Sequence, residues 1–595
     1  MLLSVGAAAL VGLVVWLLFG RVGFVNYDSA WSLNWMRELL AAGARPDLDV
    51  PFSPTPHPLS DLLSGLLVPL SDAGGLRELG TGTPPGLPEV HGVTGHDAET
   101  ALIVLAFLWI GALGVVTFLL GRAWFGTAAG VLAAVLLLTR EPVLSYGLRT
   151  YLDLPYAVLL LLALLAETHR PRNGARTLAW ITLAGLLRPE AWVLAAVYVA
   201  YLAWSRDRDR RHDRAPLRPA GVARPQDAPA AADPPTDASP ARPGPGPTPE
   251  APVGRADRST VARIRDAALP LWPLAALAAL APLGWIVEGL VLSGDPVQAL
   301  TGTQGNADDL DRDTGLVAAI TLTPRRLGEI VREPVLLAAV LGVGMSLWWM
   351  RRRALLPVGA LVAALGAFAA LGTVGLPLLT RYLVFPAALV VLLAAAGLLG
   401  WRRLPDGHAW RRRWQVAAVV CLLVLVALGP RQADRLDRLQ AALALQERVI
   451  DDLRTTVGDV VTPAAGDARC SGVIALPNHR AIPQVTLWLG RRGGRDPGLG
   501  KVPRVTTMEI AARERNRAGR PLLDRAIVLL PASERVARGF ILDKADRDRS
   551  LPEPPAGSVE AGVVGTWRIL SPDRECGRLL RTLVARAGGA DPAAR

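Results

Sequence analysis

Long apolar runs recur along the chain and alternate with polar segments rich in arginine, aspartate and proline. A helix of roughly 17–25 apolar residues is long enough to cross the hydrocarbon core of a bilayer. Runs of this kind, or somewhat shorter, lie at 2–20, 100–120, 127–139, 154–167, 268–292, 334–350, 355–373, 383–400 and 415–429. The stretch 177–204 is too long for one comfortable span, and Arg188-Pro189-Glu190 interrupts it, which predicts two short helices that meet at this tripeptide. The pattern therefore predicts a multi-pass α-helical membrane protein with about eleven spans.

The arginines between these runs predict the orientation of the chain. They occupy short loops at Arg122, 170–176, 206–214, 351–353 and 402–413. With eleven spans all five loops fall on one side of the membrane, as the positive-inside rule requires of cytoplasmic loops. The acid-rich segments fall on the other side; they are 28–99 and 294–333. We therefore expect a plasma-membrane protein with a cytoplasmic N-terminus and an extracytoplasmic C-terminus.

The composition agrees with membrane insertion, since 51% of the residues are hydrophobic, a high share for a soluble protein of this length. The formal net charge of +12 reflects the arginine-rich loops, and we interpret it as a topology signal, not as a surface for nucleic acid. The first run, 2–20, fits either a cleaved signal peptide or an anchor. Because Trp16 to Phe19 supply no small-residue cleavage site, we favour the anchor.

The same pattern divides the chain into two domains. Residues 1–430 form the transmembrane domain, in which 21–99 is the first extracytoplasmic loop. Residues 206–265 are dominated by proline, alanine, arginine and aspartate and lack periodic apolar positions, which predicts a disordered cytoplasmic loop. Residues 431–595 are predicted to form a small extracytoplasmic α/β domain, entered through a helix with an apolar stripe.

Within this second domain the short apolar runs 472–476, 526–530 and 563–570 predict strands. Cys470 and Cys576 both fall in it, where oxidising conditions permit a disulfide between them. Cys421 lies in an apolar run and is expected to be an inert small hydrophobic residue.

The first extracytoplasmic loop carries three kinds of candidate residue. Asp28 follows the first apolar run, where a lipid-borne substrate presents its head group, and it is our candidate general base. The alternative is a helix-flanking polar residue that faces water. His57 lies between prolines that hold the chain extended, so it is either a hydrogen-bond donor to a phosphate or sugar hydroxyl or part of a structural turn. Asp47 and Asp49 have the spacing of a metal-binding pair, but we interpret them as ordinary solvated acids.

Further candidates flank later runs. Arg149 and Asp153 have helical spacing on the outer rim, so they either pair with each other or place Arg149 against a lipid phosphate. Charges in the middle of an apolar stretch are costly unless they face protein or a water-filled cavity. This makes Arg188 a candidate for phosphate contact, with pairing to Glu190 as the alternative.

Arg381 and Tyr382 begin another span at the outer face. A guanidinium at this position suits phosphate recognition, although Arg and Tyr are also common anchors at the membrane interface.

Several site classes are not indicated. The acidic segment 308–315 does not match a calcium-binding EF-hand loop, because Ile320 stands where that loop needs glutamate. There is no glycine-rich phosphate loop with lysine and no zinc-type spacing of Cys and His. We expect no cofactor; a divalent metal is possible but not indicated.

Together these features resemble the GT-C superfamily of multi-pass glycosyltransferases, which includes protein O-mannosyltransferases and bacterial enzymes that modify lipid A with aminoarabinose. The resemblance covers the architecture of about 1–430 and rests on Tyr27-Asp28, the proline-rich stretch 55–59, 187–190 and Arg381-Tyr382. It implies a polyprenyl-phosphate sugar donor, Asp28 as the base, and Arg188, Arg381 or Arg149 as holders of the lipid phosphate. An inverting displacement would follow. Many relatives carry a second acid after the first, where this chain has Ser29.

The sequence thus predicts a membrane glycosyltransferase that passes a sugar to an envelope glycan, lipid or protein on the outer face, with the bilayer as surroundings and no nucleic-acid partner. A near alternative within the enzymes is a ligase or polymerase that uses a diphosphate-linked oligosaccharide. The alternatives outside the enzymes are a transporter or flippase of lipid-linked sugars and a non-catalytic membrane scaffold. A transporter is disfavoured because we find no inverted repeat and because the charges concentrate at the outer rim.

Overall fold

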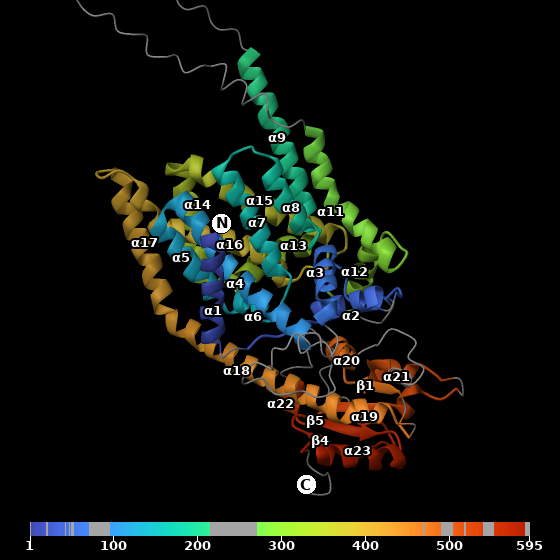
Figure 1. Cartoon of the computed structure of the whole chain (residues 1–595). Coiled ribbons are helices and arrows are strands. Elements are labelled where there is room, and N and C mark those ends of the chain that lie inside the picture. Colours follow the sequence, from blue (N-terminus) through green and yellow to red (C-terminus); the bar gives the residue numbers. More distant parts are fainter. Residues whose placement is uncertain are drawn as a thin grey trace, which may run out of the picture.

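A computed structural model describes most of the chain, namely residues 2–19, 22–41, 43–46, 48, 53–70, 96–214, 271–467, 469–470, 472–489, 504–516, 519–538 and 553–588. A large helical bundle is followed by a smaller C-terminal domain that contains a sheet (Figure 1). The long helix α18 (Gly429–Thr455) joins the two. The predicted fold class, a helical membrane domain with a small α/β domain after it, agrees with this arrangement.

Apolar helices make up the bundle. They are α1 (Leu2–Leu18), α4 (His96–Phe125), α5 (Thr127–Leu138), α6 (Glu141–Leu148), α7 (Asp153–His169), α8 (Ala175–Gly185), α9 (Glu190–Arg214), α11 (Leu271–Leu292), α13 (Leu316–Val331), α14 (Glu333–Trp349), α15 (Arg351–Thr373), α16 (Val384–Leu399) and α17 (Ala409–Ala427). Helix α16 is central, since its residues from Val384 to Leu398 are all buried and it packs against α14, α5, α7 and α4. Gly342 and Gly397 allow α14 and α16 to cross closely, because a Cβ on either would collide with the backbone of the other helix.

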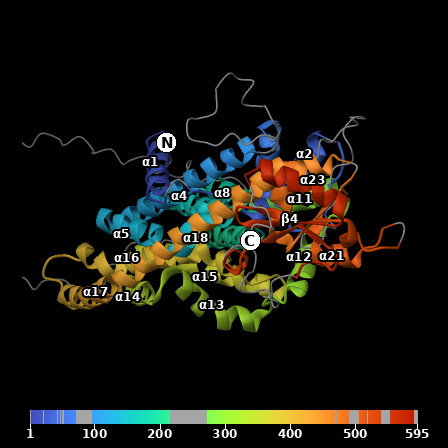
Figure 2. The ribbon, with the colours of Figure 1, turned by 90° about the horizontal axis from the view of Figure 1, so that it is seen from below.

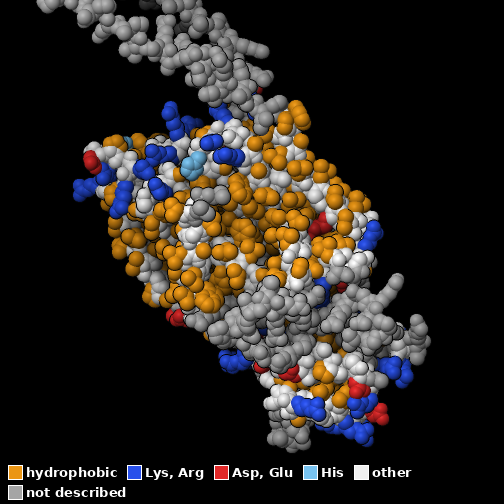
Figure 3. Space-filling model, in the orientation of Figure 1, with side chains coloured by type: hydrophobic (Ala, Val, Ile, Leu, Met, Phe, Trp, Pro, Cys, Tyr) orange, Lys and Arg blue, Asp and Glu red, His pale blue; other side chains and the backbone are white. Residues whose placement is uncertain are grey.

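Hydrophobic side chains also cover the outside of the bundle, where Figure 3 shows a broad apolar band. Leu10, Val131, Leu280, Val362 and Val419 are large apolar residues at least half exposed there. Exposure on this scale is stable in lipid and not in water. Within the described ranges four helices are long and apolar enough to cross a membrane, or up to seven if each of three bent helix pairs is one span. The predicted total of about eleven spans therefore stays a prediction.

Three helices lie at the end of the bundle that faces the C-terminal domain: α2 (Tyr27–Ala41), α3 (Pro58–Leu67) and α12 (Gln298–Asp309). The first predicted loop thus contains two helices, α2 and α3. The segment 294–333, predicted as an acidic loop, is also largely helical, because it forms α12 and α13. The apolar positions of α13 are interrupted by threonines and by Arg325-Arg326, which concealed their helical spacing.

The interrupted stretch 177–204 does break where the sequence predicted, since α8 ends at Gly185 and α9 begins at Glu190. Helix α9 is longer than expected, because it runs on to Arg214. Residues 206–214 therefore do not belong to a disordered loop. The rest of that predicted loop, 215–265, lies outside the described residues.

The C-terminal domain is built on a five-stranded sheet with the order β2-β1-β3-β5-β4. The strands are β1 (Val473–Leu476), β2 (Arg504–Thr507), β3 (Ile527–Pro531), β4 (Val559–Val564) and β5 (Trp567–Ser571). Strand β1 pairs in parallel with β2 and β3, while β5 pairs antiparallel with β3 and β4. The helices are α19 (Thr462–Ala465), α20 (Ile482–Leu489), α21 (Met508–Arg513), α22 (Glu534–Val536) and α23 (Arg574–Arg586). A disulfide joins Cys470 to Cys576, the pair proposed from the sequence, and Cys421 is buried and free.

The apolar run 563–570 is not one strand as predicted. It forms a hairpin in which Gly565 adopts a positive φ of 54° between β4 and β5. Figure 2, which views the molecule from the end that carries this domain, shows the domain over one side of the bundle with α18 leading to it.

Candidate active site

Asp28 lies in the first turn of α2, and this turn is fixed to the bundle. The side chain of Asn26 accepts a hydrogen bond from the backbone N–H of Ser29 at 2.7 Å and so caps the helix. The backbone N–H of Asn26 donates to Oγ1 of Thr150 at 3.0 Å, and the hydroxyl of Ser29 donates to the carbonyl of Thr150 at 3.3 Å. Ser29, the residue that follows Asp28, therefore has a structural partner in this chain.

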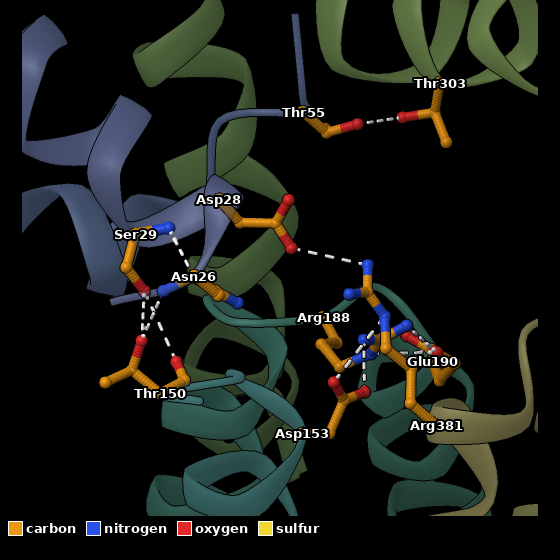
Figure 4. Close-up of polar contacts among 10 residues, drawn as sticks. All are labelled: Asn26, Asp28, Ser29, Thr55, Thr150, Asp153, Arg188, Glu190, Thr303 and Arg381. Carbon is orange, nitrogen blue, oxygen red and sulfur yellow. Dashed lines mark hydrogen bonds and ion pairs between the residues drawn. The ribbon is translucent and has the colours of Figure 1, made fainter. Parts of the chain in front are cut away.

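The carboxylate of Asp28 points to Arg381, with 3.3 Å between Oδ2 and Nη2 (Figure 4). Both side chains are partly exposed, Asp28 at 17% and Arg381 at 23%. The Nε of Arg381 also lies 3.7 Å from Oδ2 of Asp153. One guanidinium is thus shared by two carboxylates from different helices.

Arg188 lies beside this pair and is more deeply enclosed. Its Nη1 is 2.7 Å from Oδ1 of Asp153, and its Nη2 is 2.9 Å from Oε1 of Glu190. All three side chains are at most 7% exposed. The guanidinium also lies 3.5 Å from the ring centre of Tyr382. Buried charges are tolerated when they are paired and hydrogen-bonded. Arg188 meets that condition through its bonds to Asp153 and Glu190.

Ends of helical segments bring these residues together. Asp153 begins α7, Arg188 lies in the break between α8 and α9, and Arg381 belongs to the short 3₁₀ helix η2 (Thr380–Leu383) before α16. Pro189 follows Arg188 and disfavours helical geometry at it. With Asp28 at the start of α2, four segments far apart in sequence meet in one charged cluster, which holds two arginines and three carboxylates.

Other predicted residues lie elsewhere. Arg149 does not pair with Asp153, because its Nε donates to Oε1 of Gln446 at 2.9 Å and its Nη1 to Ser145. It therefore ties the bundle to α18. Asp47 and Asp49 lie outside the described residues.

His57 lies near the cluster without a direct bond to it. Its ring is edge-on to Trp285 with the centroids 5.4 Å apart, and its backbone N–H donates to Asp61 at 3.2 Å. Burial lowers the pKa of His57 to about 4, with smaller contributions from Asp28, which raises it, and from Arg188 and Arg381, which lower it. His57 is therefore neutral at physiological pH.

A pair of acids next to His57 was not predicted from the sequence. Asp61 of α3 is buried, accepts a hydrogen bond from the hydroxyl of Ser32, and shares a hydrogen bond with Glu288 of α11. Two carboxyl groups bond in this way only when one of them carries a proton. Glu288 is an acid inside the apolar run 268–292. An acid in such a run is unusual and could have identified Glu288 as a candidate residue from the sequence. Within the described part of the chain, no three His, Cys, Asp or Glu side chains are grouped as a metal site would need.

Comparisons with known proteins give distant likenesses. No protein-family model matches the chain, and no curated protein matches it. The crystal structure of ArnT from Cupriavidus metallidurans, bound to undecaprenyl phosphate, is similar over 96% of this chain and 98% of that one, at 14% identity and a TM-score of 0.44. The crystal structure of the Archaeoglobus fulgidus oligosaccharyltransferase in the apo form is similar over 74% of this chain and 56% of that one, at 15% identity and a TM-score of 0.35. Neither likeness is close enough to assign a family.

Proposed function

We propose that this chain is a GT-C-type membrane glycosyltransferase that transfers a sugar from a polyprenyl-phosphate carrier to an envelope glycan, lipid or protein on the outer face. The observation that carries the proposal is the pair formed by Asp28 and Arg381 at one end of the apolar helices. In this pair a carboxylate, which can accept a proton, lies beside a guanidinium, which can bind a phosphate, and this combination supports the proposal.

The chemistry assigns one role to each partner. The oxygen of the acceptor hydroxyl attacks the anomeric carbon of the donor sugar, and Asp28 takes the proton from that hydroxyl. The bond between that carbon and the phosphate oxygen breaks, and the polyprenyl phosphate leaves with the bonding electrons. Arg381 stabilises the charge that develops on the leaving phosphate. A single base opposite the leaving group gives inversion at the anomeric carbon.

Of the three arginines considered from the sequence, Arg381 has the capacity for this role. Arg149 is engaged with α18, and Arg188 is enclosed by Asp153 and Glu190. The Nε of Arg381 makes no hydrogen bond to the described residues. We therefore assign Arg188 a positioning role, in which it holds Asp153 beside Arg381.

The test is sugar transfer from a radiolabelled polyprenyl-phosphate hexose or pentose in membranes that contain wild-type protein or Asp28→Asn. Asp437→Asn serves as a matched control, because Asp437 is exposed on α18 away from the cluster. We expect transfer with the wild type and the control and its loss in Asp28→Asn at equal expression. Transfer that survives in Asp28→Asn would move the base elsewhere. Absence of transfer from every donor would favour the transporter or the scaffold.

A further inference from the structure

Helix α2, which carries Asp28, shares a hydrophobic core with the C-terminal domain. Trp31 and Trp35 stack with their ring centroids 5.9 Å apart and are 6% and 1% exposed. They belong to the same buried cluster as Val485 and Trp488 of α20 and Ile474 of β1. Part of the apolar face of α2 is thus covered by the domain that follows the bundle.

Buried polar side chains of α2 also bond to the backbone of α20. Arg37 is 3% exposed and donates from Nη1 to the carbonyl of Leu487 at 3.0 Å and from Nη2 to that of Thr486 at 3.4 Å. The last carbonyls of a helix have no partner within the helix, and a cation is favoured beside them. Asn34 is 2% exposed and donates to the carbonyl of Pro483 at 2.9 Å.

Contacts on the other side of Asp28 complete the attachment. The side chain of Gln484 donates to the carbonyl of Val25 at 3.2 Å. The rings of Tyr27 and His479 meet edge to face at 5.3 Å. The segment 479–489 therefore holds the chain both before and after Asp28.

Helix α20 is itself anchored to the bundle. The indole of Trp488 donates to Oε2 of Glu99, in the first turn of α4, at 3.1 Å. The same oxygen lies 2.8 Å from Nη2 of Arg454 on α18. Glu99 is 4% exposed, so this junction is buried and strongly constrained. Helix α20 is thus a fixed support, tied to two long helices.

We propose that α20 positions the catalytic base: Arg37 and Asn34 attach α2 to this support and so set the place of Asp28 relative to Arg381. The C-terminal domain then acts in the transfer step by holding the base. This inference rests on the proposed function. A displacement of about 1 Å at a reacting group can reduce a rate by roughly two orders of magnitude, so the attachment has a measurable consequence.

The experiment compares full-length wild type with Arg37→Met, which keeps an apolar stem and removes the guanidinium. Asn34→Ala removes the donor to Pro483 and the acceptor of a bond from Nη2 of Arg37 but keeps the guanidinium, and it serves as the milder second variant. The matched control is Arg568→Met, because Arg568 pairs with Glu560 on the sheet, away from α2. Each protein is examined in detergent by hydrogen exchange of the backbone amides of 27–36 and of the sheet, and in membranes by sugar transfer.

For Arg37→Met we expect faster exchange in 27–36 with unchanged protection of β1 and β3. We expect kcat to fall on the order of tenfold or more, while KM for the donor changes less than about twofold. Asn34→Ala should shift both readouts in the same direction by less, and Arg568→Met should shift neither.

Unchanged exchange in 27–36 of both α2 variants, or an equal loss of kcat in Arg568→Met, would overturn the inference. If exchange in 27–36 rises but kcat does not fall, α20 holds α2 without positioning the base, and the inference is likewise wrong. Wild-type protein that transfers no sugar would overturn the proposed function, while the exchange data would still report whether α20 holds α2.

Discussion

Arg188 and Arg381 lie in one network but differ in burial and in the lengths of their ion pairs. Arg188 is buried between Asp153 and Glu190 with short contacts to both. Arg381 has longer contacts, 3.3 Å to Asp28 and 3.7 Å to Asp153. Under the proposed function, a donor phosphate at Arg381 would compete with Asp28, so donor binding would free the carboxylate that accepts the proton.

This competition predicts that Asp28→Asn binds a polyprenyl phosphate more tightly than the wild type. Asparagine keeps the shape of the side chain but removes the charge that opposes the phosphate. We expect an increase in affinity of about three- to tenfold, on the scale of a partly exposed ion pair. Titration of the purified proteins by microscale thermophoresis measures it. Arg381→Met should weaken binding, and equal affinity of Asp28→Asn and the wild type would contradict the competition.

His57 predicts a pH dependence of stability. Its pKa falls from the ordinary 6.5 to about 4 on folding, so the unfolded chain binds a proton between these values that the folded chain does not bind. The contribution of His57 to the free energy of unfolding therefore decreases as the pH falls from about 6.5 to about 4. Thermal unfolding of His57→Gln over this window should show a smaller decrease than the wild type. His169→Gln, at an exposed histidine of α7, is the control, and equal slopes for all three proteins would refute the prediction.

At the scale of elements, Arg188 joins the break between α8 and α9 to the start of α7 through Asp153. Replacing Arg188 with methionine leaves Asp153 and Glu190 buried without their shared cation. Loss of one partner from a buried ion network costs about 3–5 kcal/mol, so Arg188→Met should lower the unfolding temperature strongly. Arg381→Met, at a more exposed side chain, should lower it less. Thermal unfolding in detergent measures both, and the reverse order would show that the network is not centred on Arg188.

The elements also show what the sequence pattern does and does not contain. The apolar runs predicted the helices of the bundle, and Arg188-Pro189 predicted the break between α8 and α9. Both signals can be recognised in the sequence alone, because a charge and a proline interrupt an apolar run. The partner of Arg149 was not visible, since Gln446 is 297 residues away. Each candidate residue of the cluster was predicted separately, from its position beside or within an apolar run. Their meeting in one cluster depends on how helix ends pack, which no local periodicity encodes.

The packing of α2 on the C-terminal domain was not predicted either, because the contacting residues are far apart in the sequence. Trp31 and Trp35 fall in the segment 21–99, which was predicted as a loop, while their buried cluster includes Val485 and Trp488, more than 400 positions later. Arg37 lies in the same predicted loop, and its burial against α20 depends on a partner about 450 positions later.

For the molecule as a whole, the two ends of the apolar band differ in charge. Exposed arginines gather at the end opposite the C-terminal domain, where Figure 3 shows a group of basic side chains. They include Arg351, Arg352 and Arg353 at the start of α15 and Arg412 and Arg413 in α17. Asp28 and Arg381 lie toward the other end, with the C-terminal domain. The positive-inside rule predicts that the arginine-rich end faces the cytoplasm and that the cluster lies on the outer side.

Single cysteines test this orientation. In a background with Cys421 replaced by serine and the disulfide retained, Asp434→Cys on α18 should react with a membrane-impermeant maleimide added to intact cells, because it lies on the C-terminal side of the band. Arg352→Cys should react only after the cells are opened. Both positions are exposed, so access depends on the side of the membrane alone. The opposite labelling would put Asp28 and Arg381 on the cytoplasmic face, where an acceptor on the outer face could not reach the base, and the proposed transfer would have to be reassigned to that side.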